Sequence, residues 1–229
     1  MFFKQRVPQE VGARGSLKWI QRLVETNPAL LTDAIRAFGG DDAEWTIDWL
    51  SPRRKDDWAE YRDAQFLVKV GLPQHQEALA AFWPAGGPQW DALGLSSSKE
   101  VILVEAKAHF DELTSHCGAG KGSRVLIDAA LSTTKTALGI AVDANWLSPY
   151  YQYANRLAHI QFLQTLGVKA RLAFVYFYGD TDMRGPMSPS EWKQRLATVK
   201  AQLGIVRPLA DLGVLDIFIP VQALGAAVV

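Results

Sequence analysis

The sequence predicts an α/β protein in which a central mixed β-sheet is flanked by helices. Three observations lead to this fold class. Segments with the apolar alternation or continuous hydrophobicity of strands recur along the chain, and segments with helical spacing separate most of them. Two strands, however, follow one another with only the polar stretch SSSK between them, which indicates an antiparallel hairpin. Interleaved strands and helices favour layers of helices around a sheet.

The first half of the chain is predicted to lead into this hairpin. Two short helices between residues 16 and 38 are broken at Asn27-Pro28 and closed by Gly39-Gly40. The alternating segment 44–50 is a predicted strand that Pro52 ends. A helix should then run from about Asp56 to Val70, because Asp56 and Asp57 suit a first turn. The remaining predictions here are a short helix near 75–82, a turn at 84–88 and the hairpin strands 89–95 and 100–108.

The second half alternates helices and strands. Helices are predicted near 123–138 and 148–166, and Ser148-Pro149 has the residue types of an N-cap and first helical position. Residues 170–180 form a nearly continuous apolar run, as expected for a strand covered on both faces. A helix should follow Ser188-Pro189 and end near Gly204, and the segment 214–221 is the last predicted strand.

Composition and cysteine usage fit one folded domain. The chain has 229 residues, of which 48% are hydrophobic and 10% aromatic, and a chain of this length buries enough surface to fold without disulfides. We expect a single domain over residues 1–229, with the helices at 16–38 as an elaboration. Cys117 is the single cysteine, so it cannot form an internal disulfide, and this fits a reducing compartment.

The sequence shows no signal for a membrane or for export. No run of about 18 apolar residues occurs, and the apolar stretch in MFFKQRVPQE is too short for a signal peptide. We therefore expect a cytoplasmic protein with no membrane partner.

Two charged residues interrupt the strand VILVEAKA. Its valine and isoleucine content predicts an interior strand, yet Glu105 and Lys107 stand two residues apart and so face the same side of the sheet. An isolated buried charge costs several kcal/mol. A simple ion pair on a half-exposed strand would explain the two residues without any function.

Asp91 adds a third charged group to the pair. It lies in the neighbouring strand of the predicted hairpin, 14 residues before Glu105, and hairpin pairing can bring its carboxylate to the same face. Two carboxylates supply the hard oxygen ligands that Mg²⁺ or Mn²⁺ prefer. Lys107 can then orient or deprotonate a metal-bound water.

These residues carry a family resemblance. The segments GPQWDALGL and VILVEAKA resemble the Asp…Glu-x-Lys signature of the PD-(D/E)XK nuclease superfamily, whose fold is restriction-endonuclease-like. The resemblance implies metal ligation by Asp91, Glu105 and the backbone carbonyl of Ala106, with Lys107 serving the attacking water. The proline of the superfamily's name is displaced, because Pro88 stands three residues before the aspartate and Trp90 takes its position.

A further acid is implied, because many members of the superfamily contribute one from a helix before the hairpin. Glu60 lies on the inward stripe of the helix predicted at 56–70 and is the preferred candidate for a catalytic role. Asp63, on the same predicted helix, and Glu77 are the alternatives. A solvated helix edge remains an equal explanation for Glu60.

Substrate contacts are predicted on two helices. On the helix at 148–166, four polar residues recur on one face and can form a wall of the active cleft: Gln152, Asn155, Arg156 and His159. Gln152 resembles a glutamine that shapes the site in the exonuclease-like branch of the superfamily. Arg156 stands where that branch has a tyrosine, and a basic residue there can bind a phosphate. Lys121 and Arg124, at a helix start after a glycine-rich loop, can contact a phosphate backbone.

The expected function is Mg²⁺-dependent (or Mn²⁺-dependent) hydrolysis of phosphodiester bonds in nucleic acid. The sequence itself does not distinguish the two nucleic acids, and we favour DNA over RNA as the partner. The alternative is a non-catalytic module of the same fold that binds nucleic acid or protein. Its support is the balance of 24 basic and 24 acidic residues, since proteins that coat nucleic acid are usually basic.

Overall fold

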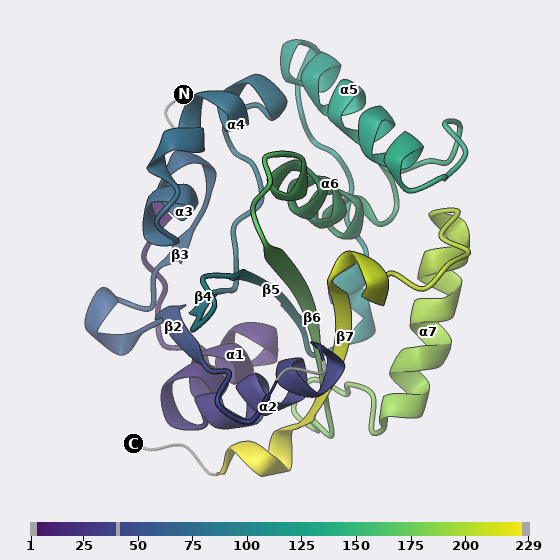
Figure 1. Cartoon of the computed structure of the whole chain (residues 1–229). Coiled ribbons are helices and arrows are strands. Elements are labelled where there is room, and N and C mark those ends of the chain that lie inside the picture. The colour runs from purple at the N-terminus through teal and green to yellow at the C-terminus, as the bar shows by residue number, and fades with distance from the viewer. Residues whose placement is uncertain (1–3, 40–41, 226–229) are drawn as a thin grey trace.

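The protein is built around a five-stranded mixed β-sheet. The computed structural model describes residues 4–39 and 42–225 (Figure 1). The sheet has the order β2-β4-β5-β6-β7. The pairs β2-β4 and β4-β5 are antiparallel, whereas β5-β6 and β6-β7 are parallel. The strands are β2 (Ile47–Ser51), β4 (Ala92–Ser96), β5 (Val101–Lys107), β6 (Ala170–Tyr178) and β7 (Val214–Pro220). The predicted α/β class, the mixed sheet and the central hairpin are confirmed.

Helices cover both faces of the sheet. The described residues form seven α-helices: α1 (Gly15–Thr26), α2 (Pro28–Gly39), α3 (Asp63–Lys69), α4 (Gln76–Phe82), α5 (Lys121–Ala137), α6 (Tyr151–Thr165) and α7 (Pro189–Gln202). Helices α1 and α2 pack on one face of the sheet. They form a core there with the even-numbered residues of β5, such as Ile102 and Val104. The helices from α3 onward pack on the other face, where Val101 and Leu103 point (Figure 1). Glu105 and Lys107 therefore lie on the side of α6.

The helix predicted at 56–70 is wrong in its first half. Arg54–Asp56 is a short 3₁₀ turn, and Glu60–Tyr61 is the strand β3, which pairs antiparallel with β1 (Arg6–Val7). Asp57 and Trp58 both have a positive φ, near 50°, which ends any helix there. The Asp56 carboxylate binds Arg6 and Lys69 instead of capping a helix.

The start of the helix predicted at 148–166 is also corrected. Helix α6 begins at Tyr151, and Ser148 does not cap it, because Ser148 Oγ lies 2.7 Å from His116 Nδ1. The first-turn amide of Gln152 instead donates to Ser115 Oγ at 2.8 Å. The helix predicted after Ser188-Pro189 is confirmed as α7, and Ser188 caps it, since Glu191 N donates to its Oγ at 3.3 Å.

No helix among the described residues combines the length and the apolar character needed to cross a membrane.

Candidate active site

A polar pocket with a volume of about 450 Å³ lies where β5 ends. Asp91, just before β4, enters it from one side, and helix α6 forms the opposite wall. Seven side chains that the sequence singled out line this pocket together: Glu60, Asp91, Glu105, Lys107, Gln152, Asn155 and Arg156. They come from β3, from the residue before β4, from β5 and from α6, so the fold brings four segments of the chain to one point.

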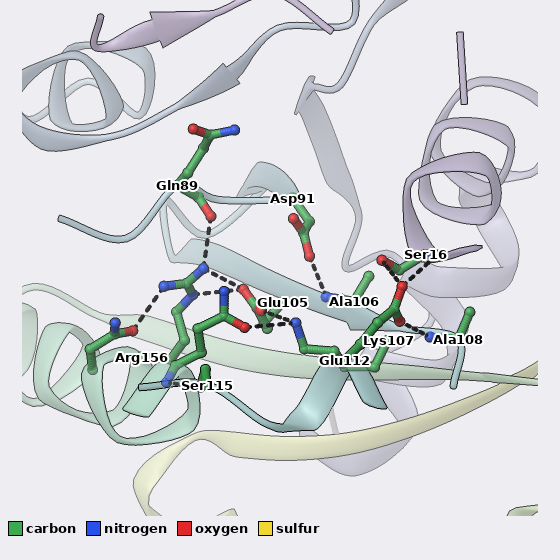
Figure 2. Close-up of polar contacts among 12 residues, drawn as sticks. Ser16, Gln89, Asp91, Glu105, Ala106, Lys107, Ala108, Glu112, Ser115 and Arg156 are labelled. Atoms are coloured by element: carbon green, nitrogen blue, oxygen red, sulfur yellow. Dashed lines mark hydrogen bonds and ion pairs between the residues drawn. The ribbon is translucent and has the colours of Figure 1, made fainter. Parts of the chain in front are cut away.

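Glu105 is held between two cations at the centre of the pocket (Figure 2). Lys107 Nζ donates to its Oε1 at 2.6 Å, and Arg156 Nε donates to its Oε2 at 2.7 Å. Arg156 Nη2 also lies 2.5 Å from Oε2. Because the Glu105 side chain is only 3% exposed, this network replaces the water that the carboxylate loses on burial.

Asp91 is bound to the backbone beside Glu105. Its Oδ2 accepts a hydrogen bond from Ala106 N at 2.6 Å (Figure 2), and its own amide donates to Val104 O at 3.2 Å. Backbone groups alternate in direction along a strand, so the carbonyl of Ala106 points toward the same neighbour as that of Val104. The Asp91 carboxylate and the Ala106 carbonyl therefore lie on the same edge of β5.

Glu60 reaches the pocket from β3 and not from a helix. Its Oε2 accepts hydrogen bonds from Gln9 Nε2 at 3.1 Å and from Gln89 Nε2. The residue is buried. Burial raises the pKa of Glu60, and the negative charge of Glu105 raises it further.

The two acids on the hairpin have opposite pKa shifts. Burial, together with the charges of Glu105 and Glu60, raises the pKa of Asp91 well above its ordinary value. Burial would also raise the pKa of Glu105, but Arg156 and Lys107 outweigh it and lower that pKa. Burial disfavours the charged form of Lys107, yet Glu105 and Asp91 raise its pKa above the ordinary value. Lys107 consequently keeps its proton at neutral pH.

Helix α6 contributes most of the predicted polar wall. Gln152 Oε1 accepts from Lys107 Nζ at 3.2 Å, and Asn155 Oδ1 accepts from Arg156 Nη1 at 2.8 Å. Asn155 also lines the pocket. His159 is the exception, because it is buried behind the wall with Nδ1 2.8 Å from Asn155 O. Burial lowers the pKa of His159 to about 3, so the ring is neutral.

Four other candidates do not line the pocket. Lys121 and Arg124 lie at the exposed start of α5, where Arg124 pairs with Asp128 at 2.9 Å. Asp63 fixes the turn before the hairpin, since its carboxylate accepts from Gly86 N at 3.0 Å and Gly87 N at 2.9 Å. Glu77 is exposed on α4. Of the three acids considered before the hairpin, Glu60 alone lines the pocket.

Some residues around the site were not predicted from the sequence. Gln89 donates to Glu60 through its side chain and accepts from Arg156 Nη2 through its carbonyl at 2.9 Å. Glu112 binds Ala108 N at 2.5 Å and Ser16 N at 3.2 Å, which ties the end of β5 to the start of α1 (Figure 2). The position of Gln89 between Pro88 and Asp91 could have pointed to it. The contact between Glu112 and Ser16 could not be predicted from local sequence, because the two residues are 96 positions apart.

Within residues 4–39 and 42–225, no group of three or more His, Cys, Asp or Glu side chains is arranged to hold a metal ion. A metal here would need two carboxylates completed by a backbone carbonyl and other oxygens. Comparison of the chain with protein-family models, curated proteins and solved structures finds no match.

Proposed function

We propose that this protein is a metal-dependent nuclease of the PD-(D/E)XK, restriction-endonuclease-like type, which hydrolyses phosphodiester bonds of nucleic acid. The observation that carries the proposal is the convergence of Asp91, Glu105 and Lys107 on one polar pocket at the end of β5. Buried charges on an apolar sheet are costly, and perturbed carboxylates in a cleft are typical of functional sites.

The pocket offers the oxygen ligands that a divalent cation such as Mg²⁺ prefers. Asp91 and Glu105 would hold the ion together with the carbonyl of Ala106, which points to the Asp91 side of β5. Burial, together with the charges of Glu105 and Glu60, raises the pKa of Asp91, and a bound cation would favour its charged form. When bound, Mg²⁺ or Mn²⁺ polarises a phosphodiester and lowers the pKa of a coordinated water.

Lys107 is proposed to stabilise charge and not to act as the general base. The acids that surround it raise its pKa, so it has no free electron pair at neutral pH. Its ammonium group is held by Glu105 and Gln152. From there it can orient a water nucleophile or stabilise the negative charge that develops on the phosphate.

Arg156 and Gln152 are proposed to bind the substrate phosphate. A guanidinium group matches two phosphate oxygens in a bidentate geometry. Lys121 and Arg124, outside the pocket, would contact a more distant part of the strand. We retain DNA as the favoured substrate over RNA.

A second candidate function is a binding module that does not cleave. It is favoured by the contacts of Glu105, because both carboxylate oxygens already accept hydrogen bonds from cationic side chains. In such a module the network would be purely structural, and the pocket would take an anionic group on Arg156 without a metal.

Incubation of the pure protein with labelled single-stranded and double-stranded DNA and RNA tests the two candidates. Each substrate is combined with Mg²⁺, Mn²⁺ or EDTA. Cleavage that requires the metal and is lost in Asp91→Asn supports the nuclease. Binding without cleavage under every metal supports the module.

A further inference from the structure

Arg156 occupies the position on Glu105 that an incoming cation would need. Its Nε and Nη2 both lie on Oε2, at 2.7 and 2.5 Å, while Lys107 Nζ lies on Oε1 at 2.6 Å. Neither oxygen of the carboxylate is therefore free. A divalent ion on Glu105 would stand next to at least one fixed positive charge.

Arg156 has other partners that would keep it in the pocket without Glu105. Its Nη1 donates to Asn155 Oδ1 at 2.8 Å and its Nη2 to Gln89 O at 2.9 Å. Its guanidinium carbon lies 5.0 Å from the ring centroid of Trp90. If Arg156 releases Glu105, it remains bound at the wall of the same pocket, where an anionic ligand can reach it.

We propose that Arg156 competes with the metal ion for Glu105, so that the ion binds strongly only when a substrate phosphate draws the guanidinium away. This inference rests on the proposed metal-dependent function and concerns the control of the same site. The guanidinium and a divalent cation repel each other across the carboxylate. A phosphate attracts both, and so replaces Glu105 as the partner of Arg156.

Linkage makes the coupling reciprocal. If phosphate strengthens metal binding, the metal strengthens phosphate binding by the same factor. Arg156 is then a positioning residue that suppresses metal loading in the absence of substrate. A residue that merely supported Glu105 from behind would have the opposite effect, because loss of such support typically weakens metal affinity by about 10–100-fold.

Titration calorimetry with Mn²⁺ and no nucleic acid tests the sign of the effect. We expect Arg156→Gln to bind Mn²⁺ on the order of tenfold more tightly than the wild type, because one repelling charge is removed. Arg156→Lys keeps a charge but loses the two-nitrogen contact and should bind with intermediate affinity. Equal or weaker binding by both variants overturns the proposal.

A second variant controls for the loss of an arginine that pairs with a glutamate and lies over a tryptophan ring. Arg171 pairs with Glu100 at 3.0 Å and lies 5.0 Å from the ring centroid of Trp45, outside the pocket. Arg171→Gln should leave the Mn²⁺ affinity unchanged. If Arg156→Gln does not fold, as judged by circular dichroism, Arg156→Lys must still bind Mn²⁺ more tightly than the wild type, or the proposal fails.

The titrations also separate this inference from the proposed function. If the wild type binds Mn²⁺ and Asp91→Asn does not, the metal site stands, and unchanged affinity in Arg156→Gln overturns the competition alone. If none of the proteins binds Mn²⁺, the metal site and the competition fall together. If Mn²⁺ binding appears in Arg156→Gln and is absent from the wild type, the competition is supported in its strongest form.

Discussion

The carboxylate of Asp91 accepts a hydrogen bond from the backbone amide of Ala106 at 2.6 Å. The last paired residues of β4 and β5 are Ala92 and Val104, so this side-chain bond continues the hairpin beyond its backbone ladder. Asp91 is thereby fixed beside the residue that follows Glu105 before any ligand binds. A site held in this way is preorganised. The free-energy cost of burying the Asp91 carboxylate is part of folding and does not have to be supplied when a ligand binds.

Asp91→Asn should stabilise the metal-free protein at neutral pH. Burial and the neighbouring acids raise the pKa of Asp91, so its contribution to stability is present below the ordinary pKa and is lost as the pH rises through the folded value. A neutral asparagine avoids that loss and can still accept from Ala106 N. Thermal unfolding in EDTA should show a higher Tm at pH 7, about 2–4 °C for each kcal/mol gained, and a smaller difference near pH 4. A lower Tm of Asp91→Asn at pH 7 would contradict the conclusion that the buried Asp91 carboxylate destabilises the metal-free protein.

Glu105→Gln should have the opposite effect in the same assay. Arg156 and Lys107 lower the pKa of Glu105 against the effect of burial, so its stabilising contribution is present above the ordinary pKa and is lost as the pH falls through the folded value. Removing one member of a buried ion pair typically costs about 3–5 kcal/mol. Urea unfolding at pH 7 should therefore show a clear loss of stability. Equal stability of the variant and the wild type would mean that the network is not formed in solution.

Glu60→Gln should reduce cleavage while Glu77→Gln does not. Glu60 lines the pocket and its charge acts on Asp91, whereas Glu77 is exposed on α4. Loss of a supporting acid at a metal site typically costs about 10–100-fold in affinity or activity. Initial rates at several Mg²⁺ concentrations measure the effect. If Glu60→Gln cleaves at the wild-type rate, Glu60 has no role in cleavage.

The strand context of Glu105 and Lys107 made the centre of the site predictable. Charges two residues apart on an apolar strand must face one side, and the connection SSSK implied that Asp91 lies on the neighbouring strand. Both inferences depend on local patterns. The same is true of the helix predicted after Ser188-Pro189, which α7 confirms.

Glu60 was selected by reasoning that the fold contradicts. The spacing of its segment suggested a helix, but β3 pairs with β1, which lies more than 50 residues earlier in the chain. Consecutive positive φ angles at Asp57 and Trp58 have no sequence signal, since neither residue is glycine. Contacts such as Gln9 with Glu60 join remote segments. Periodicity within one segment cannot reveal such pairings.

Charge reversal at the start of α5 should weaken substrate binding and leave the chemical step unchanged. Lys121 and Arg124 are outside the pocket, and Arg124 is already paired with Asp128. If they contact the phosphate backbone, Lys121→Glu should raise KM, keep kcat and lower the salt dependence of binding by roughly one unit of slope. Fluorescence anisotropy at several salt concentrations measures this. An unchanged salt slope would place the nucleic acid elsewhere.

Lys107→Ala should abolish cleavage while the protein still folds and binds nucleic acid. Lys107 carries its proton and is held between Glu105 and Gln152, so it is placed to stabilise charge that develops only in the transition state. Loss of such a group typically lowers the rate by roughly 10²–10⁴-fold and changes ground-state binding much less. Single-turnover cleavage in Mg²⁺ measures the rate, and anisotropy in Ca²⁺ measures binding.

A lysine outside the pocket serves as the control for this substitution. Lys200 forms a comparable ion pair with Asp216 at 2.5 Å between α7 and β7, and Lys200→Ala should cleave at the wild-type rate. The pH profile adds a second criterion. Because its neighbours raise the pKa of Lys107, the wild-type rate should not rise through deprotonation of this lysine between pH 6 and 9. If Lys107→Ala retains the wild-type rate, the charge on this strand serves the fold alone and the proposed chemistry is wrong.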